Sequence, residues 1–168
     1  MPMQPRTGRL TVLFMLVIGL MVALTAPAGA ATAAARSRVS VKIEMRGQLT
    51  GPDSVAGTFT STVGRIEDSG TYTETFTIVG DVIDGVKVLT GSRGTFAISV
   101  HNFIDFPTPT TATFRGGQWR ILYGTGAYSG LQGGGRPGAK GGADLAAGTV
   151  DVSHRGTARL GRTEDDAH

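Results

Sequence analysis

Asp151, Ser153 and His154 are the three residue types of a hydrolase triad, and they lie within four positions of one another. A triad needs the base within hydrogen-bonding reach of the nucleophile and of the carboxylate. All three fall in one expected strand over residues 148–160, where successive side chains point to opposite faces. Asp151 and Ser153 would then face one way and His154 the other, so the sequence predicts ordinary surface polar groups and no catalytic residue.

Two glycine patterns resemble cofactor or nucleophile motifs but fail on spacing. Gly124, Gly126 and Gly130 are spaced one residue too far apart for a dinucleotide fingerprint, and no helix is expected to follow. Ser129 has alanine two positions before it, where a nucleophile elbow needs glycine. We therefore expect no bound cofactor.

Metal-ligand patterns are also missing from the sequence. There is no cysteine, and three aspartates show no calcium-loop spacing (Asp81, Asp84 and Asp105). The three histidines are far apart and match no zinc spacing (His101, His154 and His168). The sequence thus predicts no metal site.

Two polar residues share faces with apolar ones. Glu74 has the parity of Tyr72, Phe76 and Ile78, while Asn102 has the parity of four apolar residues (Phe96, Ile98, Val100 and Ile104). A buried carboxylate is costly unless it is paired, so such a position suggests a binding site. We predict a ligand site with Glu74 and Asn102 as polar anchors and with apolar walls (Tyr72, Phe76 and Tyr123). Alternatively, Glu74 lies near a strand end or pairs with an arginine, or a one-residue slip puts the other faces inside.

The segments that carry these residues are predicted to be strands. Residues 39–46 alternate apolar and polar side chains without a break, which indicates a strand with one buried face. Further strands are expected at 55–66, 71–79, 82–83, 86–89, 95–105, 110–115, 118–123 and 148–160. Turns are expected at 51–53, 67–70, 84–85, 91–94 and 116–117, with a break in pairing at 106–109. Short strands at this spacing predict an all-β fold, a small antiparallel β-barrel of about eight strands.

A glycine-dense stretch over 124–142 holds nine glycines in nineteen residues. Bent strands in a small barrel use glycine where two backbones approach closely. The stretch would be either a pair of bent strands or a mobile lid. A frayed, charged tail is expected at 161–168.

The amino-terminal region has the pattern of an export signal. Arg6 and Arg9 precede an uncharged apolar run over 10–26, and small residues at 28–30 give a cleavage site, with 33–35 as a second option. We expect a signal peptide at 1–30, a flexible segment at 31–37, a barrel domain at 38–160 and a secreted product. An uncleaved membrane anchor is the alternative, because the run is nearly long enough to span a bilayer.

Charge and composition narrow the function classes. Without Arg6 and Arg9, 14 of the 16 basic side chains remain against 13 acidic ones, so the mature protein is near neutral despite a pI of 9.7. The basic residues are scattered, which speaks against a nucleic-acid partner. Hydrophobic residues make up 40% of the chain and charged ones 17%, which argues against intrinsic disorder.

The segment from Trp119 to Gly133, WRILYGTGAYSGLQG, is the most distinctive. It resembles the G-G/T-G-aromatic-x-G-A/L-x-G signature of the allene oxide cyclase and dirigent-like barrel superfamily, which includes small secreted bacterial proteins of largely unknown function. The resemblance implies a barrel with a cavity, but no pocket residue of those proteins can be matched to this sequence. A lipocalin- or avidin-like barrel is the alternative.

Three functions remain open from the sequence. A barrel of about eight strands can enclose one small ligand, so we favour a secreted protein that binds a small hydrophobic molecule. The first alternative is a cyclase or isomerase acting on a reactive hydrophobic substrate, although we lean against an enzyme. The second is a structural or surface-interaction protein whose barrel is filled by its own side chains. The oligomeric state is left open.

Overall fold

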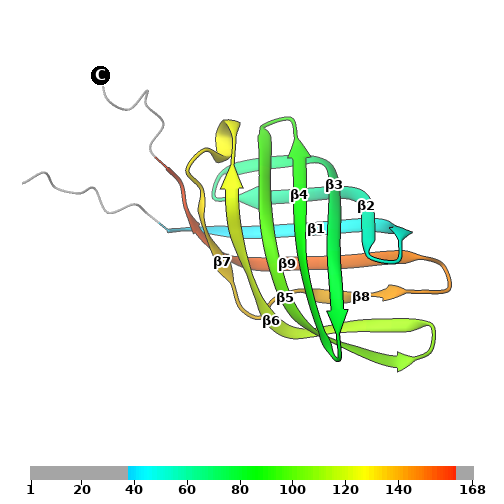
Figure 1. The fold of residues 1–168 in the computed structure, drawn as a ribbon. Coiled ribbons are helices and arrows are strands. Elements are labelled where there is room, and N and C mark those ends of the chain that lie inside the picture. Colours follow the sequence, from blue (N-terminus) through cyan, green and yellow to red (C-terminus); the bar gives the residue numbers. More distant parts are fainter. Residues whose placement is uncertain (1–37, 162–168) are drawn as a thin grey trace, which may run out of the picture. The chain divides into compact units, whose positions relative to one another are not determined.

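The computed structural model describes residues 38–161, which form a single antiparallel β-barrel (Figure 1). The nine strands are β1 (Arg38–Gly51), β2 (Ser54–Val63), β3 (Ile66–Val79), β4 (Val82–Gly91), β5 (Gly94–Thr108), β6 (Thr111–Gly124), β7 (Gln132–Gly135), β8 (Lys140–Asp144) and β9 (Thr149–Arg159). One turn of 3-10 helix, η1 (Gly126–Tyr128), follows β6. In this part of the chain no helix is long and apolar enough to cross a membrane.

The barrel closes through pairing between β1 and β9, the first and last strands. β7 and β8 each pair with both β6 and β9, so together they fill one position between those strands. The barrel therefore has eight strand positions, and the expected fold class is confirmed. The glycine-dense stretch contributes η1, β7 and β8. The expected signal peptide, the segment 31–37 and the tail after Gly161 lie outside the described residues.

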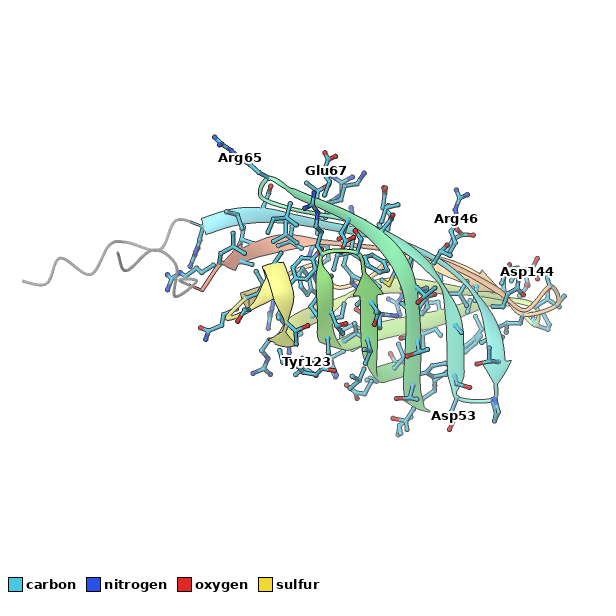
Figure 2. All side chains as sticks on the ribbon, turned by 90° about the horizontal axis from the view of Figure 1, so that it is seen from above. Arg46, Asp53, Arg65, Glu67, Tyr123 and Asp144 are labelled. Atoms are coloured by element: carbon cyan, nitrogen blue, oxygen red, sulfur yellow. The ribbon has the colours of Figure 1, made fainter. Side chains whose placement is uncertain are left out.

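Period-two alternation sets the two faces of the barrel. On β1, Val41, Ile43 and Met45 are at most 3% exposed, whereas the residues between them face outward. Corresponding residues of the other strands complete the core, including Phe59, Leu89, Phe96, Ile98, Trp119 and Val152. Figure 2 shows the opposite set, with Arg46 and Arg65 projecting away from the ribbon.

The expected turn at Asp84-Gly85 is wrong, because both residues lie inside β4. The chain instead reverses between Val79 and Val82, where Gly80 has a φ of 63° that suits glycine. Gly85 serves a different purpose: it faces the interior, and a Cβ there would lie 3.2 Å from an oxygen of Glu74. The glycine therefore leaves room for a buried side chain and makes no turn.

Three other expected boundaries are also corrected. Residues 67–70 belong to β3, since the turn falls earlier, at Gly64 and Arg65. β5 continues to Thr108, beyond the expected break at residue 106, but its pairing with β6 does shift between Asp105 and Thr108, as expected there. Gly116 and Gly117 lie within β6, where pairing with β5 shifts between His101 and Phe103. Both glycines have positive φ, so they form an irregularity that bends one strand where a hairpin was expected. The turns at 51–53 and 91–94 are confirmed.

The barrel end near η1 is closed by Tyr128. Its ring is fully buried and lies 4.7 Å, centroid to centroid, from that of Phe96. Its hydroxyl donates to Asp68 on the inner face of β3, 3.0 Å away. Entry from this end is therefore blocked by a packed and hydrogen-bonded aromatic side chain.

Candidate functional site

A small cavity of about 60 Å³ lies at the barrel end opposite η1. All eight strand positions contribute to its wall, which places it on the barrel axis. Glu74 is charged, and the other described residues that line the cavity are apolar. The lining consists of Leu49, Val55, Glu74, Phe76, Ile78, Ile83, Ile104, Phe106, Ala112, Phe114, Ala143, Leu145 and Val150.

The cavity opens at a partly exposed apolar rim. Ile78, Phe106 and Leu145 line it and are 43%, 50% and 38% exposed. Deeper in the same lining, Ile83, Ile104 and Ala112 are buried and form a cluster of their own. The hydrophobic wall therefore continues from solvent to the buried carboxylate of Glu74.

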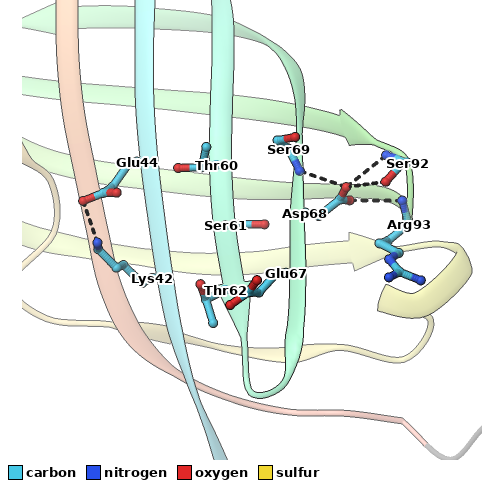
Figure 3. Close-up of a pocket in the computed structure, with 10 residues that line it drawn as sticks. All are labelled: Lys42, Glu44, Thr60, Ser61, Thr62, Glu67, Asp68, Ser69, Ser92 and Arg93. Carbon is cyan, nitrogen blue, oxygen red and sulfur yellow. Dashed lines mark hydrogen bonds and ion pairs between the residues drawn. The ribbon is translucent and has the colours of Figure 1, made fainter.

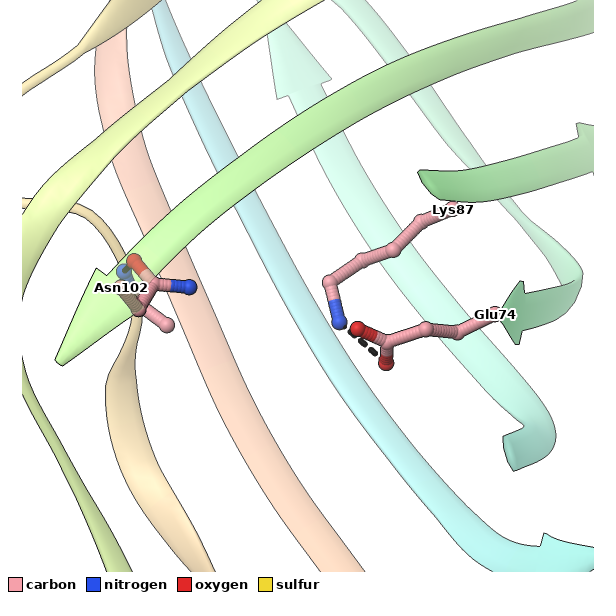
Figure 4. Close-up of polar contacts among 4 residues, drawn as sticks. Glu74, Lys87 and Asn102 are labelled. Carbon is pink, nitrogen blue, oxygen red and sulfur yellow. Dashed lines mark hydrogen bonds and ion pairs between the residues drawn. The ribbon is translucent and has the colours of Figure 1, made fainter. Parts of the chain in front are cut away.

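Glu74 forms an ion pair with Lys87 inside the barrel (Figure 4). The two residues are direct partners in the pairing of β3 with β4, and their side chains are about 5% and 4% exposed. Burial lowers the pKa of Lys87, while the charge of Glu74 and a hydrogen bond to it work in the opposite direction. The pair places one positive and one negative charge beneath the cavity.

Tyr72 lies next to this pair, two residues before Glu74 on the same face of β3. It is 1% exposed, and its hydroxyl has no hydrogen-bond partner among residues 38–161. A Cβ built on Gly47 would meet both this hydroxyl and the side chain of Val55, which lines the cavity. Burial raises the pKa of Tyr72, and the charges of Glu74 and Asp151 add to the effect. The hydroxyl thus stays protonated and able to donate.

His154 lies inside the barrel on β9, fully buried, with its ring 6.0 Å from that of Trp119. Within the described chain neither ring nitrogen has a hydrogen-bond partner of ordinary geometry. Burial and, to a smaller extent, the positive charge of Lys87 lower its pKa to about 3, although the nearby Gly138 backbone partly offsets them. The imidazole is therefore neutral at physiological pH.

The prediction that Asp151 and His154 point to opposite faces is confirmed, but the expectation that His154 is a surface polar group is wrong, because it is fully buried. Asp151 is exposed and pairs with Arg46 at 3.1 Å, on the outer face, whereas His154 faces the interior. The side chains lie on opposite faces of β9, as period two requires.

Three of the residues predicted as ligand-binding lie together in the barrel. Tyr72 and Glu74 are buried, and Phe76 follows them towards the rim as a partly buried residue of the cavity wall. Asn102 is also inside, but it lies apart from the ion pair in Figure 4. Its Oδ1 accepts a hydrogen bond of 2.8 Å from the Ala139 amide, which ties β5 to the segment between β7 and β8.

Tyr123 does not form a wall of the barrel interior, contrary to the prediction. It is 50% exposed and lies on the outside (Figure 2). Ile98 pairs with Ile121, but its neighbour Ala97 pairs with Tyr123, so β6 carries one extra residue there. This bulge turns both Leu122 and Tyr123 outward, which strict alternation cannot anticipate.

The sequence reasoning missed four interior polar residues: Ser61, Asp68, Lys87 and His154. Lys87 has the parity of Ile83 and Leu89, and His154 has the parity of Val150 and Val152. The signal was therefore present on both strands. It was obscured on β4 by the misplaced turn at Asp84-Gly85.

A second polar cluster lies at the end near η1, around the buried Asp68 (Figure 3). The carboxylate accepts hydrogen bonds from the Ser69, Ser92 and Arg93 amides and from the hydroxyls of Ser92 and Tyr128. Burial alone would raise the pKa of Asp68, but these hydrogen bonds outweigh it and lower the pKa. The donors come from β3, from the β4–β5 turn and from η1. Asp68 therefore links these three segments and stabilises this end of the barrel.

A polar pocket of about 430 Å³ lies beside Asp68, with hydroxyl and charged side chains from β1 to β3 around it. Lys42 and Glu44 in its lining pair with each other at 2.8 Å and are half-exposed. No group of three or more histidine, aspartate or glutamate side chains in residues 38–161 is arranged to hold a metal ion.

A solved structure of a pterocarpan synthase dirigent protein is similar to this chain, with a TM-score of 0.46 and 17% sequence identity. The match covers 75% of this chain and 92% of the dirigent protein. At that level of similarity it carries no information about what this chain binds. No protein-family model and no curated protein matches the sequence.

Proposed function

We propose that the protein binds a small hydrophobic molecule at the open end of the barrel. The observation that carries this proposal is the cavity on the barrel axis, whose apolar wall runs from an exposed rim down to Glu74. Loss of water from apolar surface on both partners would drive binding. The closed end around Tyr128 leaves this rim as the point of entry.

The size of the cavity limits what the interior can hold. At about 60 Å³ it is far smaller than the roughly 300–1,000 Å³ of pockets that enclose drug-sized ligands. A chain-like or single-ring molecule would place one end inside and rest the remainder against Ile78, Phe106 and Leu145. This mode uses the exposed rim as part of the site.

Binding is favoured over the cyclase or isomerase alternative by the state of the polar groups. A general acid or base must be free to exchange a proton with the reacting group. Glu74, the charged residue of the described cavity wall, is instead held by Lys87. The centre of the barrel is packed with its own side chains, as the filled-barrel alternative expects, and the open, apolar mouth is the feature that favours binding over that alternative.

The binding test uses N-phenyl-1-naphthylamine, an uncharged probe whose fluorescence rises in apolar surroundings. We expect saturable binding to the wild type and at least a ten-fold loss of affinity in Ala112→Phe, which fills the buried part of the cavity. Leu122→Phe enlarges an exposed residue on the outer face and serves as the control. Phe106→Ala at the rim tests the same site without crowding the core.

Two results would overturn the proposal. One is absence of probe binding to the folded wild type. The other is equal affinity in wild type, Ala112→Phe and Phe106→Ala, with thermal unfolding showing that both variants are folded.

We further propose that the barrel acts outside the cell after removal of residues 1–30, a proposal supported by the charged start, apolar run and small residues of the sequence. The mass of the protein collected from culture medium tests it. A mass beginning at Ala31 agrees with export and cleavage, whereas a full-length, membrane-associated product contradicts them.

A further inference from the structure

The polar side chains beneath the cavity have unused hydrogen-bonding capacity. The hydroxyl of Tyr72 has no hydrogen-bond partner in the described chain. The ammonium group of Lys87 has three N–H donors, and the partner that the described chain gives it is Glu74. Buried polar groups in folded proteins are normally paired, so unpaired ones call for a partner that enters from outside. The same is true of the two ring nitrogens of His154, which lie deeper, beside Trp119.

These groups lie next to the apolar cavity. Glu74 itself lines it, and Lys87 is paired with Glu74 across the β3–β4 ladder. The Tyr72 hydroxyl neighbours Val55, another residue of the cavity wall. A molecule that enters with its polar end first would reach the carboxylate and the hydroxyl at the bottom of an otherwise hydrophobic channel.

The charges of the polar side chains beneath the cavity determine which kind of polar group a ligand can place there. Glu74 and Lys87 neutralise each other, and His154 is neutral. A carboxylate or an ammonium group placed here would be a third buried charge without a partner, which is strongly unfavourable. An uncharged group that donates or accepts hydrogen bonds would fill the unused capacity at no such cost.

We propose that Tyr72, Glu74 and Lys87 form the polar end of the ligand site, and that this end receives an uncharged hydroxyl or carbonyl group of a hydrophobic molecule. The inference rests on the proposed function and adds the chemical class of the ligand and the direction in which it enters. It also assigns Tyr72 and Lys87 a role in specificity.

The test compares four octyl compounds on the full mature protein: 1-octanol, 2-octanone, octanoate and octylammonium. Trp119, the one tryptophan of the chain, lies in the core and reports binding by fluorescence, with calorimetry as the second measurement. We expect 1-octanol and 2-octanone to bind at least ten-fold more tightly than the two ions at pH 7.

A purely apolar cavity would also bind ions weakly. A variant is therefore needed to show that hydrogen bonds to the protein contribute to the affinity for uncharged ligands. Tyr72→Phe removes a hydroxyl that has no partner in the described chain, and the fold should be unaffected. We expect it to weaken 1-octanol and 2-octanone three- to ten-fold and to leave the isosteric 1-fluorooctane unchanged. Tyr123→Phe, the same change on the exposed outer face, should alter none of these affinities.

The outcomes separate the two proposals. If neither the naphthylamine probe nor any octyl compound binds, the proposed function fails and this inference fails with it. If the probe and 1-fluorooctane bind but Tyr72→Phe changes 1-octanol affinity less than two-fold, only the inference is overturned. The latter result would assign the unused hydrogen bonds to internal water, as would tight binding of octanoate.

Discussion

Glu74 and Lys87 face each other across β3 and β4 as direct register partners and form an ion pair inside the barrel. The pairing follows from the turn between Val79 and Val82, since each step back from that turn adds one cross-strand pair. Both residues also follow the inward parity of their strands. Two opposite charges are thereby held inside the barrel, at the apolar cavity that Glu74 lines.

Removing one partner of this pair should destabilise the protein severely. Lys87→Met leaves the Glu74 carboxylate buried without its counter-charge, which costs about 3–5 kcal/mol in comparable cases. The double variant Glu74→Met/Lys87→Met removes both charges and should recover most of that loss, because apolar replacements of buried pairs are often neutral or stabilising. Urea denaturation of the three proteins measures the free energies of unfolding.

The exposed pair of Lys42 and Glu44 provides the matched control. Lys42→Met removes the same kind of charge from a half-exposed position, where water replaces the lost partner, and should leave the unfolding midpoint nearly unchanged. Equal destabilisation by Lys87→Met and Lys42→Met would show that the interior pair is not buried as described.

The neutral, buried His154 predicts a loss of stability in mild acid. Its pKa is about 3 when folded and about 6.5 when unfolded, so between these values the unfolded state binds the extra proton. The free energy of unfolding should therefore fall as the pH is lowered from 6.5 towards 3, by up to about 1.4 kcal/mol per pH unit. Denaturant titrations at pH 7, 6, 5 and 4.5 measure the slope.

Asp68 contributes little between pH 7 and 4.5, because its pKa is lowered from 3.8 and its stabilising effect is lost only as the pH falls below that value. His154→Leu should flatten the slope between pH 6.5 and 4.5. An unchanged slope in His154→Leu would contradict the assignment.

The Asp68 cluster predicts graded losses at the closed end. Tyr128→Phe removes one of the hydrogen bonds to the carboxylate and should cost about 1–3 kcal/mol, as expected for a donor to a charged acceptor. Asp68→Ala leaves several donors without an acceptor in a partly buried site and should cost more. Hydrogen exchange of the Ser92 and Arg93 amides measures the local effect. Exchange in Asp68→Ala as slow as in the wild type would rule out this stabilising role.

Replacement of Gly57 or Gly80 by alanine should destabilise the protein for two different physical reasons. At Gly57 a Cβ would approach the backbone of Arg46 and Gly47 to less than 3 Å, so Gly57→Ala must push β1 and β2 apart and should cost about 2–3 kcal/mol. Gly80 has open space around it but a φ of 63°, so Gly80→Ala should cost only about 1 kcal/mol. Thermal unfolding ranks the two variants, and a larger loss in Gly80→Ala would reverse this account.

Local patterns along the chain were enough to predict the fold class and much of the inner face. Period-two alternation is a local property, so the inward positions of Val41, Ile43 and Met45 could be predicted from neighbours along the chain. The same parity puts Tyr72 and Glu74 on one face of their strand with Phe76, and the structure shows that this face is the inner one. The composition of the turns then favoured an antiparallel barrel.

The register of the strands, the bulges and the side-chain partners follow from long-range pairing. Asp84-Gly85 has the composition of a hairpin turn, yet long-range pairing of β4 with β3 and β5 keeps it inside a strand. The register that results brings Lys87 opposite Glu74, and the extra residue in β6 turns Tyr123 out of the barrel. Such features depend on which strands meet across the sheet, and local alternation holds no information about that choice.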